Sequence, residues 1–167
     1  MAHMIRTAAI DDDDQLVALD VAAWDPTNSP GPRPTADDPF FQDGRPISDT
    51  FVAELDGRVA GYVLVGAGWP MQSHAHVAHL RGLAVAAEFR GRGIARDLVE
   101  HALGQLALRG ARRIRSRVLA TNPASLAVHA ACGFVEEGRL RGEFVIEGIG
   151  PVDDVLLAFT FDDPPAP

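Results

Sequence analysis

A strand, a glycine-bearing turn and a helix follow one another from Leu80 onward, and this order constrains the fold more than any other stretch. The apolar run from Leu80 to Val85 has the length of a buried strand. Gly91 and Gly93 then allow backbone conformations that other residues disfavour, which indicates a turn. A helix is predicted next, because apolar residues recur every three or four positions: Ala95, Leu98, Val99, Ala102, Leu103 and Leu106.

The start of this helix is a candidate anion site. Backbone N–H groups in a first helical turn lack intrahelical partners, and the helix dipole favours negative charge there, so a phosphate-bearing ligand could bind. Arg90 and Arg92 add positive charge. The same pattern also occurs as a simple packing element, and both interpretations stay open. Nucleotide motifs fit less well, because a Walker loop needs Gly-Lys-Ser or Gly-Lys-Thr where this chain has Gly93-Ile94-Ala95.

The segment Arg90-Gly91-Arg92-Gly93-Ile94-Ala95 resembles the acetyl-CoA pyrophosphate loop of GNAT-type N-acetyltransferases. A second segment, from Asn122 to Phe134, is similar to the later cofactor-contacting segment of that superfamily. Asp153 to Ala158 resembles its closing strand, so the likeness covers roughly residues 50 to 161. Within the superfamily the chain resembles the phosphinothricin and ribosomal-protein-type acetyltransferase branches.

This resemblance implies direct transfer of an acetyl group from acetyl-CoA to an amine, with no covalent enzyme intermediate and no metal. Backbone groups of the strand before the loop would pair with the pantetheine arm, and N–H groups at the helix start would bind the pyrophosphate. The implied cofactor-binding residues are Leu83, Ala84, Val85, Arg90, Gly91, Arg92, Gly93, Ile94, Ala95, Arg96, Asn122 and Ser125.

The reaction also needs a base, because an alkyl ammonium with a pKa near ~10.4 must lose a proton before it attacks. The candidates are His79, His76 and Glu54, of which Glu54 is equally an ordinary exposed residue of a hairpin strand. Many members of the superfamily carry a carboxylate around the position of Arg81, where this chain is basic.

His129 stands seven residues after Asn122, where the superfamily commonly has a tyrosine that assists the departing thiolate. A histidine there could hydrogen-bond the sulfur or have a structural role, and both readings stay open. Tyr62, the only tyrosine, falls in a predicted hairpin and is not expected to replace the missing phenol.

The remaining elements predict an α/β sandwich with a mixed, mainly antiparallel sheet of six to seven strands flanked by helices, as in GNAT proteins. Parallel pairing is expected only across the central crossover helix. The first helix follows Asp11 to Asp14, which supply an N-cap and negative charge rather than a metal site. The predicted strands span residues 4–10, 50–55, 58–65, 80–85, 112–119, 134–137, 143–146 and 154–161, and a short helix spans 123–131.

Length and composition indicate the number of domains, the location and the partners of the protein. With 167 residues and 47% hydrophobic content, we expect one domain over residues 4–161, after a probable expression remnant at 1–3 and before a flexible tail at 162–167. A single cysteine, Cys132, and no apolar run of roughly 20 residues favour a cytoplasmic protein without a membrane partner. A net charge of −8 argues against nucleic acid as a partner. A zinc site at His74, His76 and His79 is disfavoured, because no carboxylate or cysteine lies at a helpful spacing.

We therefore expect an N-acetyltransferase acting on a primary amine of a small molecule or a protein N-terminus. The alternative is a catalytically silent acyl-CoA-binding module, suggested by the missing tyrosine and the uncertain base. Acceptors are expected to meet the proline-rich segment from Trp24 to Asp49 and the region from Arg139 to Pro151. A homodimer formed through exposed strands near the C-terminus is plausible.

Overall fold

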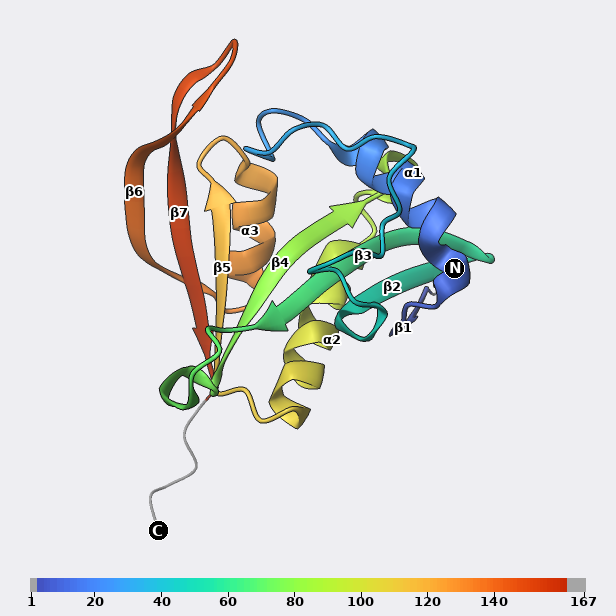
Figure 1. The fold of residues 1–167 in the computed structure, drawn as a ribbon, viewed down its shortest axis with the longest axis horizontal. Coiled ribbons are helices and arrows are strands. Elements are labelled where there is room, and N and C mark those ends of the chain that lie inside the picture. Colours follow the sequence, from blue (N-terminus) through green and yellow to red (C-terminus); the bar gives the residue numbers. More distant parts are fainter. Residues whose placement is uncertain (1–2, 162–167) are drawn as a thin grey trace.

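The structure is a computed structural model that describes residues 3–161, and it is built around a single seven-stranded sheet (Figure 1). The strand order is β1-β2-β3-β4-β5-β7-β6, and every neighbouring pair is antiparallel except β4 with β5. This confirms the predicted mixed, mainly antiparallel sheet. The strands are β1 (Met4–Thr7), β2 (Thr50–Leu55), β3 (Arg58–Ala67), β4 (Val77–Val85), β5 (Arg113–Leu119), β6 (Val135–Ile146) and β7 (Gly150–Thr160).

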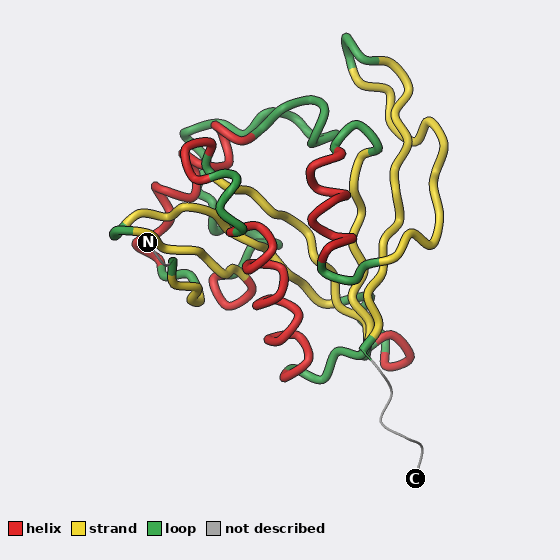
Figure 2. The backbone as a smooth tube through the Cα atoms, turned by 180° about the vertical axis from the view of Figure 1, so that it is seen from behind, coloured by secondary structure: helices red, strands yellow, loops and turns green. Residues whose placement is uncertain are grey.

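Three α-helices cover the two faces of the sheet: α1 (Asp13–Ala23), α2 (Ile94–Leu108) and α3 (Pro123–Ala131). Seen from behind, α2 and α3 pack on one face (Figure 2), where Leu98, Val99 and Ile114 are fully buried. Helix α1 packs on the other face through Leu16 and Leu19. The apolar periodicity of α2 is confirmed at five of the six predicted positions, Leu98, Val99, Ala102, Leu103 and Leu106. At the start of the helix the buried residue is Ile94, and Ala95 is only half-buried.

The crossover from β4 through α2 to β5 produces the one parallel pair, as predicted. This pairing is short: Val77 to Leu80 align with Arg113 to Ser116, and beyond that register the two strands separate (Figure 1). Segment 83–85 of β4 therefore pairs with β3 on one edge, and its other edge faces an opening in the sheet.

Several strand predictions need correction. β4 begins at Val77 rather than at Leu80, and β7 begins at Gly150 rather than at Asp154. The predicted strands 134–137 and 143–146 are one strand, β6, because register shifts at Glu136/Gly138 and Leu140/Phe144 carry the pairing with β7 past the glycines. The first strand ends at Thr7 and not at Ile10. There the Ala9 N–H donates to Asp12 Oδ2 at 2.7 Å, which starts a short 3-10 turn (Ile10–Asp12) ahead of α1.

The ends of the chain are described only in part. His3, which we had grouped with the expression remnant, lies against α2, with its Nε2 2.9 Å from Asp97 Oδ2. The rest of that remnant, residues 1–2, and the predicted tail, residues 162–167, fall outside the described residues. Among the helices of residues 3–161, none has the length and apolar character required to cross a membrane.

Candidate active site

A cavity of about 1060 Å³ occupies the place where β4 and β5 separate. Its walls come from α1, the proline-rich loop, the end of β4 and the first turns of α2 and α3. Eleven of the twelve residues that the resemblance implied as cofactor contacts line it: Leu83, Ala84, Val85, Arg90, Gly91, Gly93, Ile94, Ala95, Arg96, Asn122 and Ser125. Arg92 does not line it, and its guanidinium lies over the Phe89 ring, 5.6 Å from the ring centroid.

The glycines before α2 shape the anion-binding end of the cavity. Gly91 and Gly93 have φ angles of 74° and 81°, in the left-handed region where a side chain is strained. Gly93 is the N-cap of α2 and no side chain of the described residues caps that end, so the N–H groups of the first turn face the cavity without a side-chain acceptor. Arg90 ties this loop to β4, since its Nε donates to the Val85 carbonyl at 3.1 Å.

The end of β4 forms the middle of the cavity. Leu83, Ala84 and Val85 pair with Val63, Tyr62 and Gly61 of β3 on one edge only. A register shift at Leu64/Val65 inserts Arg81 as an extra residue in β4 just before this segment. An unpaired strand edge presents N–H and C=O groups to any ligand that carries amides, and this cavity offers such an edge.

The wall of the cavity formed by α1 and β3 contains a polar cluster that the sequence did not reveal, in which Tyr62 is buried and Asp20 and Arg45 are half-buried. The Tyr62 hydroxyl donates to Asp20 Oδ1 at 2.5 Å, and Arg45 Nη1 donates to Asp20 Oδ2 at 2.7 Å. Burial, followed by the negative charge of Asp20, raises the pKa of Tyr62, so its phenol stays protonated. A Cβ added at Gly82 would lie 3.9 Å from the Tyr62 hydroxyl, which places this cluster directly over β4.

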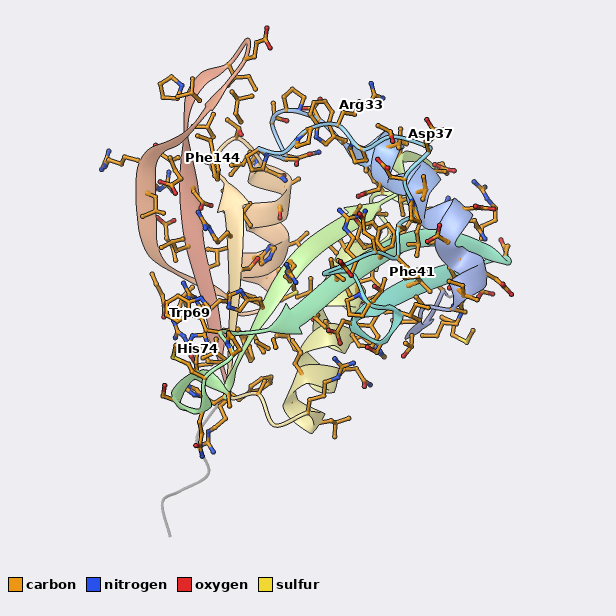
Figure 3. All side chains as sticks on the ribbon, in the orientation of Figure 1. Arg33, Asp37, Phe41, Trp69, His74 and Phe144 are labelled. Carbon is orange, nitrogen blue, oxygen red and sulfur yellow. The ribbon has the colours of Figure 1, made fainter. Side chains whose placement is uncertain are left out.

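The proline-rich loop closes the same side, as expected. Its Phe40 is 2% exposed and packs edge-on against Tyr62, with ring centroids 4.9 Å apart. Phe40 therefore anchors the loop and lines the cavity at once. Arg33, Asp37 and Phe41 mark the path of the loop beside α1 (Figure 3). None of the residues of the second expected acceptor region, Arg139 to Pro151, line this cavity, so its role in acceptor binding stays a prediction.

His129 does not reach the cavity. It is 1% exposed, and its Nδ1–H donates to the Ser125 carbonyl at 2.8 Å. Nε2 must then accept from the Ser116 hydroxyl, 2.9 Å away, so both ring nitrogens are engaged between α3 and β5. This geometry opposes the expectation that His129 meets a departing thiolate, and it favours the structural alternative.

The burial of His129 predicts a pH dependence of stability. Desolvation lowers the pKa of His129 below its usual 6.5, whereas the unfolded chain binds a proton near 6.5. Below about pH 6.5 the unfolded state therefore binds more protons, and the unfolding free energy falls as the pH falls, by up to about 1.4 kcal/mol per pH unit from this group. His129→Gln should make the profile from about pH 6.5 to 5 less steep in urea unfolding.

His76→Gln, at an exposed position, is the matched control and should leave that slope as it is. Burial also lowers the pKa of His79 and His101, so part of the slope should persist in His129→Gln. An unchanged slope in His129→Gln would contradict the neutral, doubly hydrogen-bonded state of this ring.

The three candidate bases, Glu54, His76 and His79, also lie outside the cavity lining. Glu54 Oε2 accepts from Arg6 Nε at 2.9 Å, on the strand pair β1–β2. His79 belongs to the paired part of β4, beside Arg115 of β5. None of these positions favours a role as the base, and Asp20 with Tyr62 is the better placed pair. The one sequence signal that could have indicated this pair was a carboxylate, Asp20, among the apolar residues of the first helix.

The three histidines before and within β4 do not assemble a metal centre. The His74 ring centroid lies 6.4 Å from that of His76 and 6.5 Å from that of His79. His74 instead stacks on Trp69, and its Nδ1 accepts from the Trp69 N–H at 2.9 Å. Within residues 3–161, no group of three His, Cys, Asp or Glu residues is arranged to hold a metal ion.

Comparison with known proteins places this geometry in a family. The chain is 37% identical over 67 residues to spermidine N(1)-acetyltransferase of Vibrio cholerae serotype O1, covering 40% of this chain and 39% of that protein. It is 32% identical over 81 residues to [ribosomal protein bS18]-alanine N-acetyltransferase of Salmonella typhimurium, covering 48% of this chain and 54% of that protein. The chain thus spans about two-fifths to half the length of these relatives.

Solved structures match over nearly the whole chain. The structure of smu.2055 from Streptococcus mutans UA159 superposes with a TM-score of 0.82 at 26% identity, covering 95% of this chain and 99% of that one. Ribosomal-protein-alanine N-acetyltransferase from Brucella melitensis gives a TM-score of 0.76 at 25% identity, with the same coverage. The family model described as "Acetyltransferase (GNAT) family" matches residues 16–134. The chain therefore belongs to the GNAT acetyltransferase family.

Proposed function

We propose that this protein transfers an acetyl group from acetyl-CoA to a primary amine. The observation that carries the proposal is one cavity that joins three features: the open N-terminus of α2, the unpaired edge of β4 and the Tyr62–Asp20 pair. A phosphate site, an amide-binding edge and a proton acceptor are what a thioester-dependent acyl transfer requires.

The cofactor would lie across the opening between β4 and β5. N–H groups from Gly91 to Arg96 would hold the pyrophosphate, and the edge at Leu83 to Val85 would pair with the amides of the pantetheine arm. Asn122 and Ser125 would form the opposite wall, where Asn122 Oδ1 caps α3 by accepting from the Ser125 N–H at 3.1 Å. The thioester carbonyl would then meet a backbone N–H of β4, which stabilises the oxyanion formed on attack.

The acceptor amine would approach from the side of α1. Its nitrogen forms a bond to the thioester carbon, and the C–S bond then breaks as the electron pair leaves on the CoA sulfur. A thiol with a pKa near ~8.5 leaves without a dedicated acid, so the inaccessible His129 is not needed for this step. Direct attack also agrees with Cys132, a buried thiol whose pKa burial raises, which makes a poor nucleophile.

The proton of the ammonium group would pass to the Tyr62–Asp20 pair. Because the Tyr62 hydroxyl donates to Asp20, its lone pairs are free to accept a proton from the amine while its own proton moves to the carboxylate. Asp20 would then return that proton to solvent through the open side of the cavity. The amine is thereby neutral when it attacks.

This proposal includes expectations about the acceptor, the location and the partners of the protein. The named relatives act on spermidine and on a ribosomal-protein alanine, so a small amine and a peptide amine are both candidate acceptors. Arg33, Arg45 and Arg81 line the cavity near the acceptor side together with Asp20 and Asp38, and this excess of positive charge favours acceptors that also carry a carboxylate. We also retain a cytoplasmic location, no nucleic-acid partner and a homodimer as parts of the proposal.

The test is release of CoA thiol from acetyl-CoA in the presence of amino acids, peptides and polyamines. We expect turnover with at least one class of amine and none without an acceptor. Calorimetric binding of acetyl-CoA without turnover across the panel would favour the silent acyl-CoA-binding module. Absence of both binding and turnover would refute both functions.

A further inference from the structure

A second and smaller cavity, of about 380 Å³, lies at the other end of the sheet. Residues from the start of β4 and from β5, β6 and β7 line it, and it shares no lining residue with the large cavity. Trp69 and His74 lie at this end of β5 and β7, whereas Arg33, Asp37 and Phe41 lie near α1 (Figure 3). The proposed acetyl-transfer chemistry makes no use of this second cavity.

Three arginines of β5 project into it from alternate positions, and two of them are neutralised. Arg113 pairs with Glu137, and Arg117 pairs with Asp154 and Glu143. Arg115, the middle one, is half-buried, and its guanidinium has no hydrogen-bond or ion-pair partner among residues 3–161. A partly buried, unpaired guanidinium is costly, and a carboxylate or phosphate satisfies it best.

The neighbours of Arg115 are histidines, which can donate hydrogen bonds, and they bring no unpaired carboxylate. His79, its register partner on β4, has a buried Nε2 without a hydrogen-bond partner. Burial, and after it the positive charge of Arg115, lowers the pKa of His79, so its ring adds no negative charge to this place. The imidazole of His76 also lines the cavity. In a chain with a net charge of −8, this is a local excess of positive charge.

We propose that this second cavity binds a single oxyanion, a carboxylate or a phosphate, through the guanidinium of Arg115. The planar guanidinium offers two parallel N–H donors to such a group, and His76 supplies a further donor at the wall. The volume admits a small anion and is about a third of the space in the large cavity. Trp69, 60% exposed and stacked on His74, provides a flat apolar surface at the rim for the rest of the ligand.

The oxyanion could come from a separate small molecule or from an anionic group on an extended acceptor. Both sources present the same chemistry to Arg115. Direct binding measurements therefore test the site itself, and they do not depend on whether the protein catalyses acetyl transfer.

The experiment titrates the full chain with inorganic phosphate and with succinate, with CoA present to occupy the large cavity, and follows amide shifts of residues 113–117 by NMR. We expect saturable binding. Arg115→Gln should weaken it about tenfold or more, because a charge-assisted hydrogen-bonded pair is lost. Arg115→Lys should restore part of it. Arg141→Gln is the control, because Arg141 is exposed on β6 and does not line the cavity.

Two further arms distinguish the sources. If the anion belongs to the acceptor, Arg115→Gln raises KM for carboxylated amines and leaves KM for their uncharged analogues unchanged. If a separate molecule binds, the variant loses affinity for the free anion alone. Equal anion affinity in the parent chain and Arg115→Gln, or no saturable binding of either probe, would overturn the proposal.

Discussion

Asparagine in place of Asp20 is expected to lower kcat for acetyl transfer by about 10²- to 10⁴-fold, the usual contribution of a positioned base. The side chain keeps its size, but an amide cannot accept the proton that Tyr62 passes on. Tyr62→Phe removes the hydroxyl that donates to Asp20 at 2.5 Å and should also lower kcat. KM for acetyl-CoA should change little, because neither group lies in the phosphate-binding loop. Steady-state thiol release with the best acceptor of the panel measures kcat for both variants and their KM for acetyl-CoA.

Asp38→Asn is the matched control for this effect. Asp38 lines the same cavity, but its carboxylate accepts a hydrogen bond from Thr35 Oγ1 at 2.7 Å and has no contact with Tyr62. We expect its kcat to stay close to that of the parent chain. Equal activity of Asp20→Asn and Asp38→Asn, with both proteins folded, would remove Asp20 from the mechanism.

Valine in place of Gly93 is expected to weaken acetyl-CoA binding by about 100-fold, as two charge-assisted hydrogen bonds to the pyrophosphate are lost. Gly93 has a φ of 81° at the N-cap of α2, and a β-branched residue cannot hold that angle without strain. The first turn would shift, and its N–H groups would no longer converge on the phosphates. Isothermal titration calorimetry with acetyl-CoA measures the change.

Gly110→Val separates this effect from general destabilisation. Gly110 follows the other end of α2 with a φ of 88°, and nothing lies within 4 Å of a Cβ added there. Both substitutions strain the backbone by about 1–3 kcal/mol, and both should lower the unfolding midpoint. Only Gly93→Val should lose affinity for acetyl-CoA, and a comparable loss in Gly110→Val would mean that the loop has no specific role.

The elements with local signals were the ones that the sequence could predict. Asn122 caps α3, Pro123 occupies its first position and Gly133 follows its end, so the helix bounds 123–131 are confirmed. The hairpin of β2 and β3 is confirmed for the same reason, since the turn Asp56-Gly57 joins two apolar runs. The turn before α2 was predictable because Gly91 and Gly93 act through the local backbone.

The polar part of the site depends on contacts between distant segments and could not be read locally. Asp20 and Tyr62 are 42 positions apart and meet only because α1 packs across β3 and β4. His129 was assigned by its spacing from Asn122, but the rotation of α3 against β5 turns its ring into the core, where Ser116 binds it. Spacing fixed the position of this residue in the helix and left its orientation undetermined.

The central claim is that acetyl-CoA enters the opening between β4 and β5 and reaches the N-terminus of α2. The most direct test is addition of CoA to the ¹⁵N-labelled chain with backbone amide shifts followed by NMR. The largest changes should fall on Leu83 to Val85 and on Gly91 to Arg96, with smaller ones at Asn122 and Ser125. Saturating changes confined to other parts of the sheet, with these amides unmoved, would contradict the account.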